Sequence, residues 1–341
     1  MRKLLLSLSL LAALAGFNAC STKVDLYADY KDIPIIYGLL DVTADTNYVR
    51  INRAFSSNND NPIDANEVAL IADSCNYPGK LDARMIEYKN VYGNQYEPTG
   101  REIVLDTITI HNKQEGVFYA PDQKVYFTKE QLKQNTVSHK YMYKLRVLKG
   151  NDTITSETAL VGGDEFKIIT TQVSFTSKPT NNAGKITFKP ADNAVFYDVR
   201  MQFNYKELKG GSTDTIHRQV NCSIGTKSVD ELTLESGSYA VSYGENLLFN
   251  LMESAIGGDT INVKRYFGDF IVSIAAGGEE LYNYIQVNAP SSGFSQTIPD
   301  YTNINGGYGV FSSRINLNKK VRLSARAQAD LYGKPWGFEQ Q

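Results

Sequence analysis

The stretch VFYDVRMQFNYK, residues 195–206, decides the fold class of this chain. Apolar side chains occupy every second position, a series that a helix of 3.6 residues per turn cannot collect on one face. Six repeats in a row predict a long strand with one buried face, formed by Val195, Tyr197, Val199, Met201, Phe203 and Tyr205. The 22 tyrosines and 15 phenylalanines also favour pleated sheets. We therefore expect a mainly β protein.

Shorter alternating runs carry this pattern over most of the chain. Turn residues separate them, and Gly150-Asn151-Asp152 predicts a hairpin between two of the runs. The further strands expected from these runs cover residues 35–40, 47–55, 102–110, 124–127, 141–148, 153–161, 185–189, 261–263 and 269–275.

A few segments have helical spacing instead. The sequence ENLLFNLMESAI, residues 245–256, predicts a helix, and EELYNYIQV, residues 279–287, predicts a second. Two capping boxes predict shorter turns. These boxes are Thr128 with Gln131, opening a turn over residues 129–134, and Asp64 with Glu67, opening one near residues 68–71.

The length of the chain indicates more than one domain. A chain of 341 residues exceeds what one hydrophobic core normally supports. Two polar stretches that contain glycine, residues 162–164 and 177–184, bracket a boundary near residue 172. We expect two β-sandwich domains, residues 34–172 and residues 173–341, the second with one or two inserted helices.

The first twenty residues have the organisation of an export signal. A basic start precedes an apolar run that is too short to cross about 30 Å of hydrocarbon as a helix. The small residue Ala19 followed by Cys20 resembles a bacterial lipobox. We expect a signal peptide over residues 1–19 that is removed, a lipid on Cys20 that anchors the protein to the outer membrane, and a tether over residues 20–33. The alternative is an exported protein without lipid, and the choice between periplasmic and surface-facing leaflets stays open.

Charge and cysteine content narrow the partners. The chain carries 35 Lys and Arg residues against 37 Asp and Glu residues, a net charge of −2. Such a balance gives no basic surface for nucleic acid, so we expect no nucleic-acid partner. After Cys20 only Cys75 and Cys222 remain. They could pair in an oxidising compartment, but two separately buried thiols are favoured because the pair is far apart in sequence.

The sequence shows no established motif of an enzyme or a cofactor site. His111, His139 and His217 lack the spacing of metal ligands, and no Gly-x-Ser-x-Gly, Gly-x-Gly-x-x-Gly or His-Glu-x-x-His occurs. The glycine-rich stretch at residues 303–311 lacks the flanking elements of a phosphate loop and predicts a structural turn. We expect a protein without catalytic residues, metal or cofactor.

Acidic residues offer two weaker alternatives. Paired carboxylates can hydrolyse glycosides, and oxygen-rich loops can bind calcium. The adjacent acidic pairs are Asp164-Glu165, Asp230-Glu231 and Glu279-Glu280, and the oxygen-rich loop contains Asp60, Asn61, Asp64 and Asn66. We interpret the pairs as solvated turn residues, and the loop as a turn because its spacing departs from the EF-hand order.

One aromatic segment suggests a binding surface. Tyr88, Tyr92 and Tyr96 fall in a polar stretch, residues 88–100, that is expected to be a loop. Exposed tyrosines stack on sugars or anchor protein interfaces at low entropic cost. These three residues are the candidate binding loop, and the alternative is that they cover the edge of a sheet.

Two resemblances extend this interpretation. Residues 173–206, with a proline-containing turn before a Tyr-x-Val strand, look like the early strands of a fibronectin type III or immunoglobulin-like sandwich. Residues 35–55, 116–128 and 303–311 together resemble a lipoprotein family of the Bacteroides phylum that is catalogued as a domain of unknown function. The resemblance implies an envelope lipoprotein with immunoglobulin-like parts. We expect a non-catalytic module that binds an envelope protein, or alternatively a glycan-binding accessory of a nutrient-uptake system.

Overall fold

The computed structural model describes residues 32–54, 70–93, 95–111, 113–116, 119–120, 122–178, 183–210, 212, 214–256, 262–289 and 301–340. Within them the fold is mainly β, as the alternating sequence predicts. The strands are β1 (Pro34–Leu40), β2 (Asn47–Arg53), β3 (Asp82–Tyr92), β4 (Gln95–Val104), β5 (Asp106–Ile110), β6 (Gln123–Thr128), β7 (Tyr141–Lys149), β8 (Asp152–Ala159), β9 (Gln172–Val173), β10 (Ala183–Phe188), β11 (Phe196–Lys209), β12 (Thr215–Ser228), β13 (Tyr239–Gly244), β14 (Val263–Gly277) and β15 (Tyr308–Leu323). The helices are α3 (Ala72–Cys75), the 3₁₀ turn η1 (Val229–Glu231), α4 (Leu247–Ile256), α5 (Glu279–Asn288) and α6 (Ala325–Tyr332).

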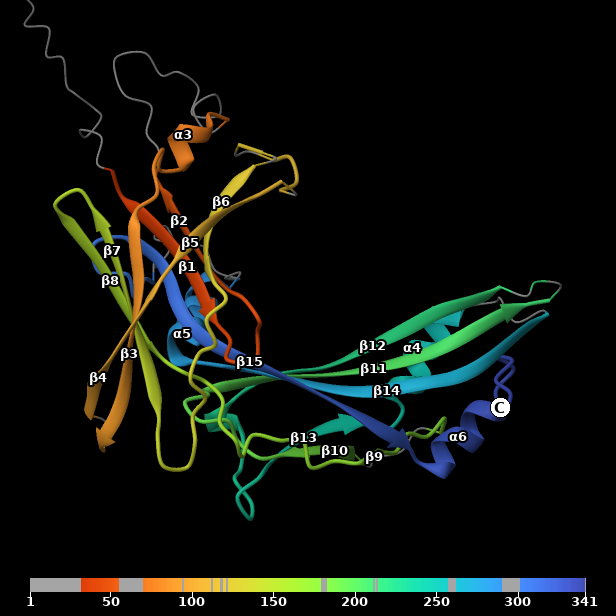
Figure 1. The fold of residues 1–341 in the computed structure, drawn as a ribbon. Coiled ribbons are helices and arrows are strands. Elements are labelled where there is room, and N and C mark those ends of the chain that lie inside the picture. The colour runs from red at the N-terminus through yellow and green to blue at the C-terminus, as the bar shows by residue number, and fades with distance from the viewer. Residues whose placement is uncertain are drawn as a thin grey trace, which may run out of the picture.

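The described strands form three sheets. The largest has nine strands in the order β12-β11-β14-β15-β1-β2-β6-β5, with β9 paired to the end of β15. A four-stranded antiparallel sheet has the order β4-β3-β7-β8, and β10 pairs with β13 in a third sheet. Figure 1 shows the four-stranded sheet beside β1, β2 and β5, while β11, β12 and β14 extend away and β9, β10 and β13 lie beneath them.

Strand β15 joins the two halves of the chain. Its first residues pair in parallel with β1, from Tyr308 opposite Ile35 to Ser313 opposite Leu40. Its later residues pair antiparallel with β14, and the strand runs through the centre of Figure 1. The nine-stranded sheet therefore takes strands from both sides of residue 172, while the predicted division into folding units at that residue stays a prediction.

The long strand predicted from residues 195–206 is β11. Its odd-numbered residues from Tyr197 to Tyr205 are buried, which confirms the predicted face. Phe188 and Tyr239, from the β10–β13 sheet, pack on the ring of Tyr197 with centroids 4.9 and 5.8 Å away. This apolar contact holds the small sheet against the large one.

The predicted helices at residues 245–256 and 279–287 are α4 and α5, and both predictions are confirmed. A third helix, α6, was not predicted; the hydroxyl of Ser324 caps it by accepting a hydrogen bond from the Ala327 N–H at 3.2 Å. None of the helices within the described residues is long and apolar enough to cross a membrane.

Three expectations about local structure are corrected. The turn predicted over residues 129–134 is wrong: Thr128 Oγ1 accepts from the Glu130 N–H at 3.0 Å, as a cap would, but the chain then continues without a helix. The strand expected over residues 102–110 is interrupted at Leu105, and the strands expected at 261–263 and 269–275 belong to the single strand β14. The helix expected near residues 68–71 falls mostly outside the described residues.

The glycine-rich stretch at residues 303–311 is a turn against the start of β1. Gly306 and Gly309 have φ angles of 84° and 113°. A Cβ on Gly309 would lie 1.9 Å from the carbonyl oxygen of Ile36, so no other residue fits there. The predicted structural turn is confirmed, and the glycines permit the parallel pairing of β15 with β1.

A second close-packed feature lies at the far end of β11 and β14, and we call it the distal cluster. Its aromatic members are Phe203, Tyr205, Phe267 and Phe338, and Trp336, two residues before Phe338, stacks on Phe249 of α4. Beside them Arg265, 1% exposed, pairs with the buried Glu207 at 3.1 Å and donates to the Trp336 carbonyl at 2.7 Å. The ion pair and the backbone bond from Arg265 N–H to Gly337 O, at 2.6 Å, fasten the carboxyl-terminal segment to β14.

Candidate functional site

The predicted lipidation site lies outside the described residues. Cys20, the signal peptide at residues 1–19 and all of the tether before residue 32 belong to this part of the chain. The same holds for the oxygen-rich loop with Asp60, Asn61, Asp64 and Asn66. These predictions therefore stay predictions.

The three candidate tyrosines lie on a β-hairpin, so the expected loop over residues 88–100 is wrong. Tyr88 and Tyr92 belong to β3, and Tyr96 belongs to β4. Asn90 N–H bonds to the Lys140 carbonyl, the last contact that β3 makes with the segment leading into β7. The hairpin continues beyond this contact, and Figure 1 shows its end at the lower left of the molecule.

Exposure differs among the three tyrosines. Tyr92 is 83% exposed and its neighbour Val91 is 50% exposed, whereas Tyr88 and Tyr96 are half-buried. Lys144 Nζ lies 4.9 Å from the centre of the Tyr88 ring, a cation–π contact that occupies that ring. The structure thus gathers the three residues at one end of one hairpin and leaves Tyr92 as the accessible aromatic surface.

The register explains how the tyrosines come together. Tyr88 is opposite Pro98, and Asn90 is opposite Tyr96. Opposed residues of an antiparallel pair share a face, so Tyr88 and Tyr96 are diagonal neighbours on the same face. Pro98 has no N–H to donate. Because β4 is the edge strand of its sheet, its outer side has no neighbouring strand that would need this donor.

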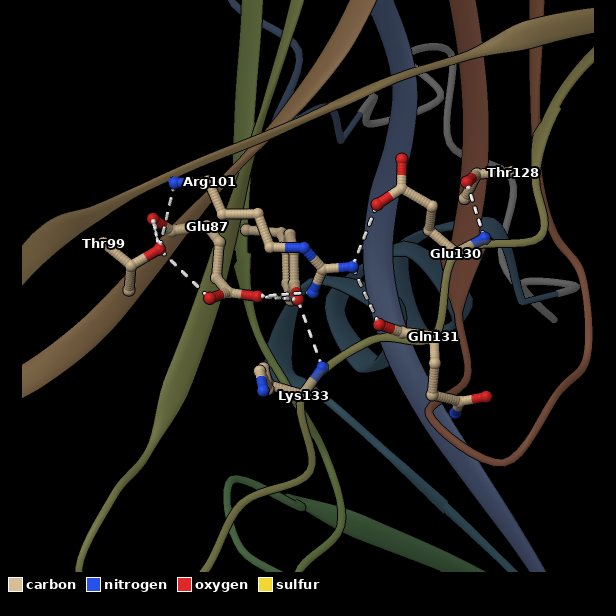
Figure 2. A network of polar contacts seen from close by, with 8 residues as sticks. Glu87, Thr99, Arg101, Thr128, Glu130, Gln131 and Lys133 are labelled. Atoms are coloured by element: carbon tan, nitrogen blue, oxygen red, sulfur yellow. Dashed lines mark hydrogen bonds and ion pairs between the residues drawn. The ribbon is translucent and has the colours of Figure 1, made fainter.

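A buried polar network supports the hairpin from its inner face (Figure 2). Glu87, 3% exposed, accepts hydrogen bonds from Tyr143 Oη at 2.6 Å, Arg101 Nη1 at 2.9 Å and Thr99 Oγ1 at 3.0 Å. These donors come from β7 and from β4. A single carboxylate therefore ties β3, β4 and β7 together, because both of its oxygens accept from donors on the neighbouring strands.

Arg101 extends this network to the chain that follows β6. Its Nη2 lies 3.1 Å from Glu130 Oε2 and donates to the Gln131 carbonyl at 3.1 Å. On the other side of the network, Lys133 N–H donates to Tyr143 Oη at 3.2 Å. These contacts hold residues 130–133 in an extended path across the sheet, which accounts for the missing helical turn.

The electrostatics of the network follow from burial and pairing. Burial, with Glu87 beside it, raises the pKa of the Tyr143 hydroxyl well above its ordinary range. Burial works against the charge of Arg101, but hydrogen bonds to Glu130 and Glu87 outweigh it and raise the pKa of that guanidinium. At neutral pH Tyr143 is therefore a neutral donor and Arg101 a cation, which suits both of them as donors to the Glu87 carboxyl group.

No group of three or more His, Cys, Asp and Glu side chains placed to hold a metal occurs in the described part of the chain. His111 Nδ1 lies 2.7 Å from Asp122 Oδ1 at the surface. No disulfide joins Cys75 and Cys222, of which the first is half-buried and the second buried. This agrees with the favoured interpretation of two separate thiols, although Cys75 is less buried than expected.

The acidic pair Glu279-Glu280 opens α5, and its two members differ. Glu279 is exposed, while Glu280 is half-buried and accepts from Ser312 Oγ at 2.9 Å and Thr158 Oγ1 at 3.1 Å. Burial raises the pKa of Glu280, and the two hydroxyls oppose that rise. The contacts give Glu280 a role in joining α5 to β15 and β8.

Sequence reasoning missed two buried carboxylates that lie within long strands, Glu87 and Glu207. Glu87 follows Ala83 and Met85 at alternate positions of β3, and Glu207 follows Phe203 and Tyr205 in the same way on β11. A charge in the buried phase of a strand needs a partner, which is the signal that could have found them.

No family model and no curated protein matches the chain.

Proposed function

We propose that this chain is a non-catalytic lipoprotein of the cell envelope, anchored to the outer membrane by lipid on Cys20, that binds an envelope protein partner. The observation that carries the proposal is the β3–β4 tip, where Tyr92 is 83% exposed beside Val91. Tyrosine is a common anchor of protein interfaces, because it supplies a large and rigid contact area at low entropic cost.

The support beneath the tip favours binding over a passive edge. The Glu87 network fixes β3, β4 and the segment at residues 130–133, so the tip loses little conformational entropy when a partner docks. The packing of the β10–β13 sheet on β11 supports the finer proposal of immunoglobulin- or fibronectin type III-like sandwiches.

Tyr92→Ser provides the test. Mild crosslinking of whole cells followed by purification should recover a partner with the wild-type chain and lose it with Tyr92→Ser. Tyr48→Ser, which removes another exposed tyrosine from β2, is the matched control and should keep the partner. Equal recovery by both variants would exclude the hairpin as the contact surface.

The anchor is tested separately. Cys20→Ala should leave the precursor uncleaved or release the chain into the soluble envelope fraction. Normal processing and membrane retention of that variant would contradict lipidation. Fractionation and mass spectrometry of the mature amino terminus measure both outcomes.

A glycan-binding accessory is the second candidate, favoured by one observation. A cavity of about 650 Å³ lies between α5 and the sheet, and Asn316, Asn318, Ser273 and Asp198 line it. Amides, hydroxyls and carboxylates are the groups that bind sugar hydroxyls. Glycan arrays with the wild type and Asn316→Ala would reveal such binding. An array without hits would exclude the glycan-binding candidate and leave the protein-partner proposal as the one candidate.

A further inference from the structure

A second cavity, of about 410 Å³, lies at the end of β2. It is formed by β1, β2, the segment after α3 and the chain before β6. Figure 1 places α3, β2 and β6 at the top of the molecule, away from the β3–β4 tip. The cavity is therefore separate from the proposed partner-binding surface.

The lining of this cavity is positively charged. Arg50, Arg53 and Lys113 line it, and among the described lining residues Asp122 is the one carboxylate. Asp122 Oδ1 is 2.7 Å from His111 Nδ1, a contact with a ring beside the cavity. Lys113 Nζ donates to the Tyr119 carbonyl, and the Arg53 guanidinium lies 5.9 Å from the centre of the Tyr77 ring, so both cations are held in place. Among the described lining residues, three cations against one carboxylate make the space attractive to an anion.

The three cations act on one point inside the cavity. Burial raises the pKa of the Cys75 thiol, and the charges of Lys113, Arg50 and Arg53 each oppose that rise. Cys75 itself lines the cavity. An anion placed near this sulfur would be within range of all three positive charges.

Asn52 orients Arg50. Its side chain is 7% exposed, and its Nδ2 donates to the Cys75 carbonyl at 2.9 Å and to Asn76 Oδ1 at 2.8 Å. Its Oδ1 accepts from Arg50 Nε. With Nε held in this way, the plane of the Arg50 guanidinium is fixed, which suits the two-point recognition of a carboxylate.

The remaining walls favour an organic anion. Ile35, Ala54 and Tyr119 supply apolar surface, and Gln123 adds an amide. A bare inorganic ion would leave this surface uncovered, whereas a small molecule with a carbon skeleton and hydroxyl or amide groups would use it. The volume is at the small end of the usual range for ligand sites.

We propose that this cavity binds a small organic carboxylate, with the charged group on Arg50 and Lys113 and the body of the ligand against Ile35 and Tyr119. This site goes beyond the proposed function, because it lies apart from the hairpin. A sugar acid and the carboxyl end of a peptide would present the same group, so the two sources are separated by experiment.

Calorimetric titration of the mature chain in detergent tests the proposal. The probes are glucuronate, the neutral glucose of matching shape, and an acetylated tripeptide with a free carboxyl end. Glucuronate or the tripeptide should bind at least about tenfold more tightly than glucose, since a charge-assisted two-point contact is worth about 1.4 kcal/mol or more. The tighter of the two identifies the source of the carboxylate.

Substitutions localise the binding. Arg50→Met should weaken the preferred carboxylate at least about tenfold, and Arg50→Lys should weaken it less because the charge remains. Arg326→Met removes an exposed arginine of α6 and is the matched control, expected to bind as the wild type does. Thermal unfolding of each variant shows whether a loss of binding reflects a loss of folding.

Alkylation of Cys75 gives an independent readout. Cys75 is half-buried and Cys222 is buried, so iodoacetamide should modify Cys75 first, and the bound carboxylate should slow this reaction while glucose does not. Equal binding of glucose and the carboxylates, the same affinity in Arg50→Met, or labelling of Cys75 unchanged by a carboxylate that binds would each overturn the proposal.

Discussion

At the β3–β4 tip an aromatic ring is exposed to solvent, whereas in the distal cluster the aromatic rings are packed together out of it. Both regions contain a buried carboxylate in the buried phase of a strand, Glu87 and Glu207, and each carboxylate pairs with an arginine. Arg101 keeps 29% of its side chain exposed, while Arg265 keeps 1%. The comparison shows that a buried glutamate paired with an arginine can support an exposed surface or close a core. The difference is whether the arginine stays partly exposed, as Arg101 does, or is buried, as Arg265 is.

The largest effect is expected in the distal cluster. Arg265→Ala leaves Glu207 buried without its closest cation and removes the bond to the Trp336 carbonyl, so we expect a loss of about 3–5 kcal/mol in the free energy of unfolding. Urea denaturation measures it. Arg200→Ala, which breaks the exposed pair with Asp198, should cost about 1 kcal/mol or less. A similar cost for both would mean that burial does not set the value of these pairs.

A smaller effect is expected beneath the hairpin. Glu87→Gln keeps the shape of the side chain but removes the charge that Arg101 and Tyr143 meet, so we expect a loss of about 1–3 kcal/mol. Glu102→Gln, at a half-exposed ion pair with Arg84 on β3, should cost less than about 1 kcal/mol. If Glu87→Gln is neutral, the network is not what fixes the tip.

Low pH should weaken the contact that Asp330 of α6 makes with Thr176 and Ser177. Its carboxylate accepts from the Ser177 N–H at 2.8 Å and from the Ser177 and Thr176 hydroxyls, and these bonds lower its pKa. A lowered folded pKa gives stability that is complete above the ordinary value near 3.9 and is lost as pH falls through the folded pKa. Asp330→Asn should therefore be about 1 kcal/mol less stable at pH 7 and approach the wild type in acid. A gap that persists unchanged to low pH would contradict this origin.

The smallest effect on stability is expected at the tip itself. Tyr92→Ser changes a side chain that is mostly in solvent, so the free energy of unfolding should stay within about 0.5 kcal/mol of the wild type. Tyr88→Ser should cost more because that ring is half-buried under Lys144. A large loss in Tyr92→Ser would show that the ring is a packed residue and not a contact surface.

The sequence predicted the elements whose pattern is local. Strand β11 and helix α4 were predicted because each buries one face, which leaves a period of 2 or 3.6 in the residues. The β3–β4 tip was mistaken for a loop because a projecting hairpin exposes both faces, so residues 91–100 show no alternation. The turn expected at 129–134 failed because Arg101, from another strand, bonds to the Gln131 carbonyl.

The candidate site was predicted only in part. The three tyrosines were recognised by composition, and the structure brings them to one hairpin end. The support under them depends on pairs such as Tyr143 with Glu87, separated by 56 residues, which a single sequence does not reveal. The parallel pairing of β1 with β15 was out of reach for the same reason.

The position of β1 also has a mechanical consequence. A pull on the amino-terminal end of the chain enters the fold at Pro34, along the axis of a strand bonded on one side to β2 and on the other to β15. Load in this direction shears the ladder bonds on both sides together instead of unzipping them one by one. We expect single-molecule pulling between residue 32 and the carboxyl-terminal end to record one high-force rupture of β1, and a series of small steps would contradict it. A molecule tethered at its amino-terminal end is thus loaded in shear along β1, with ladder bonds on both sides resisting the pull.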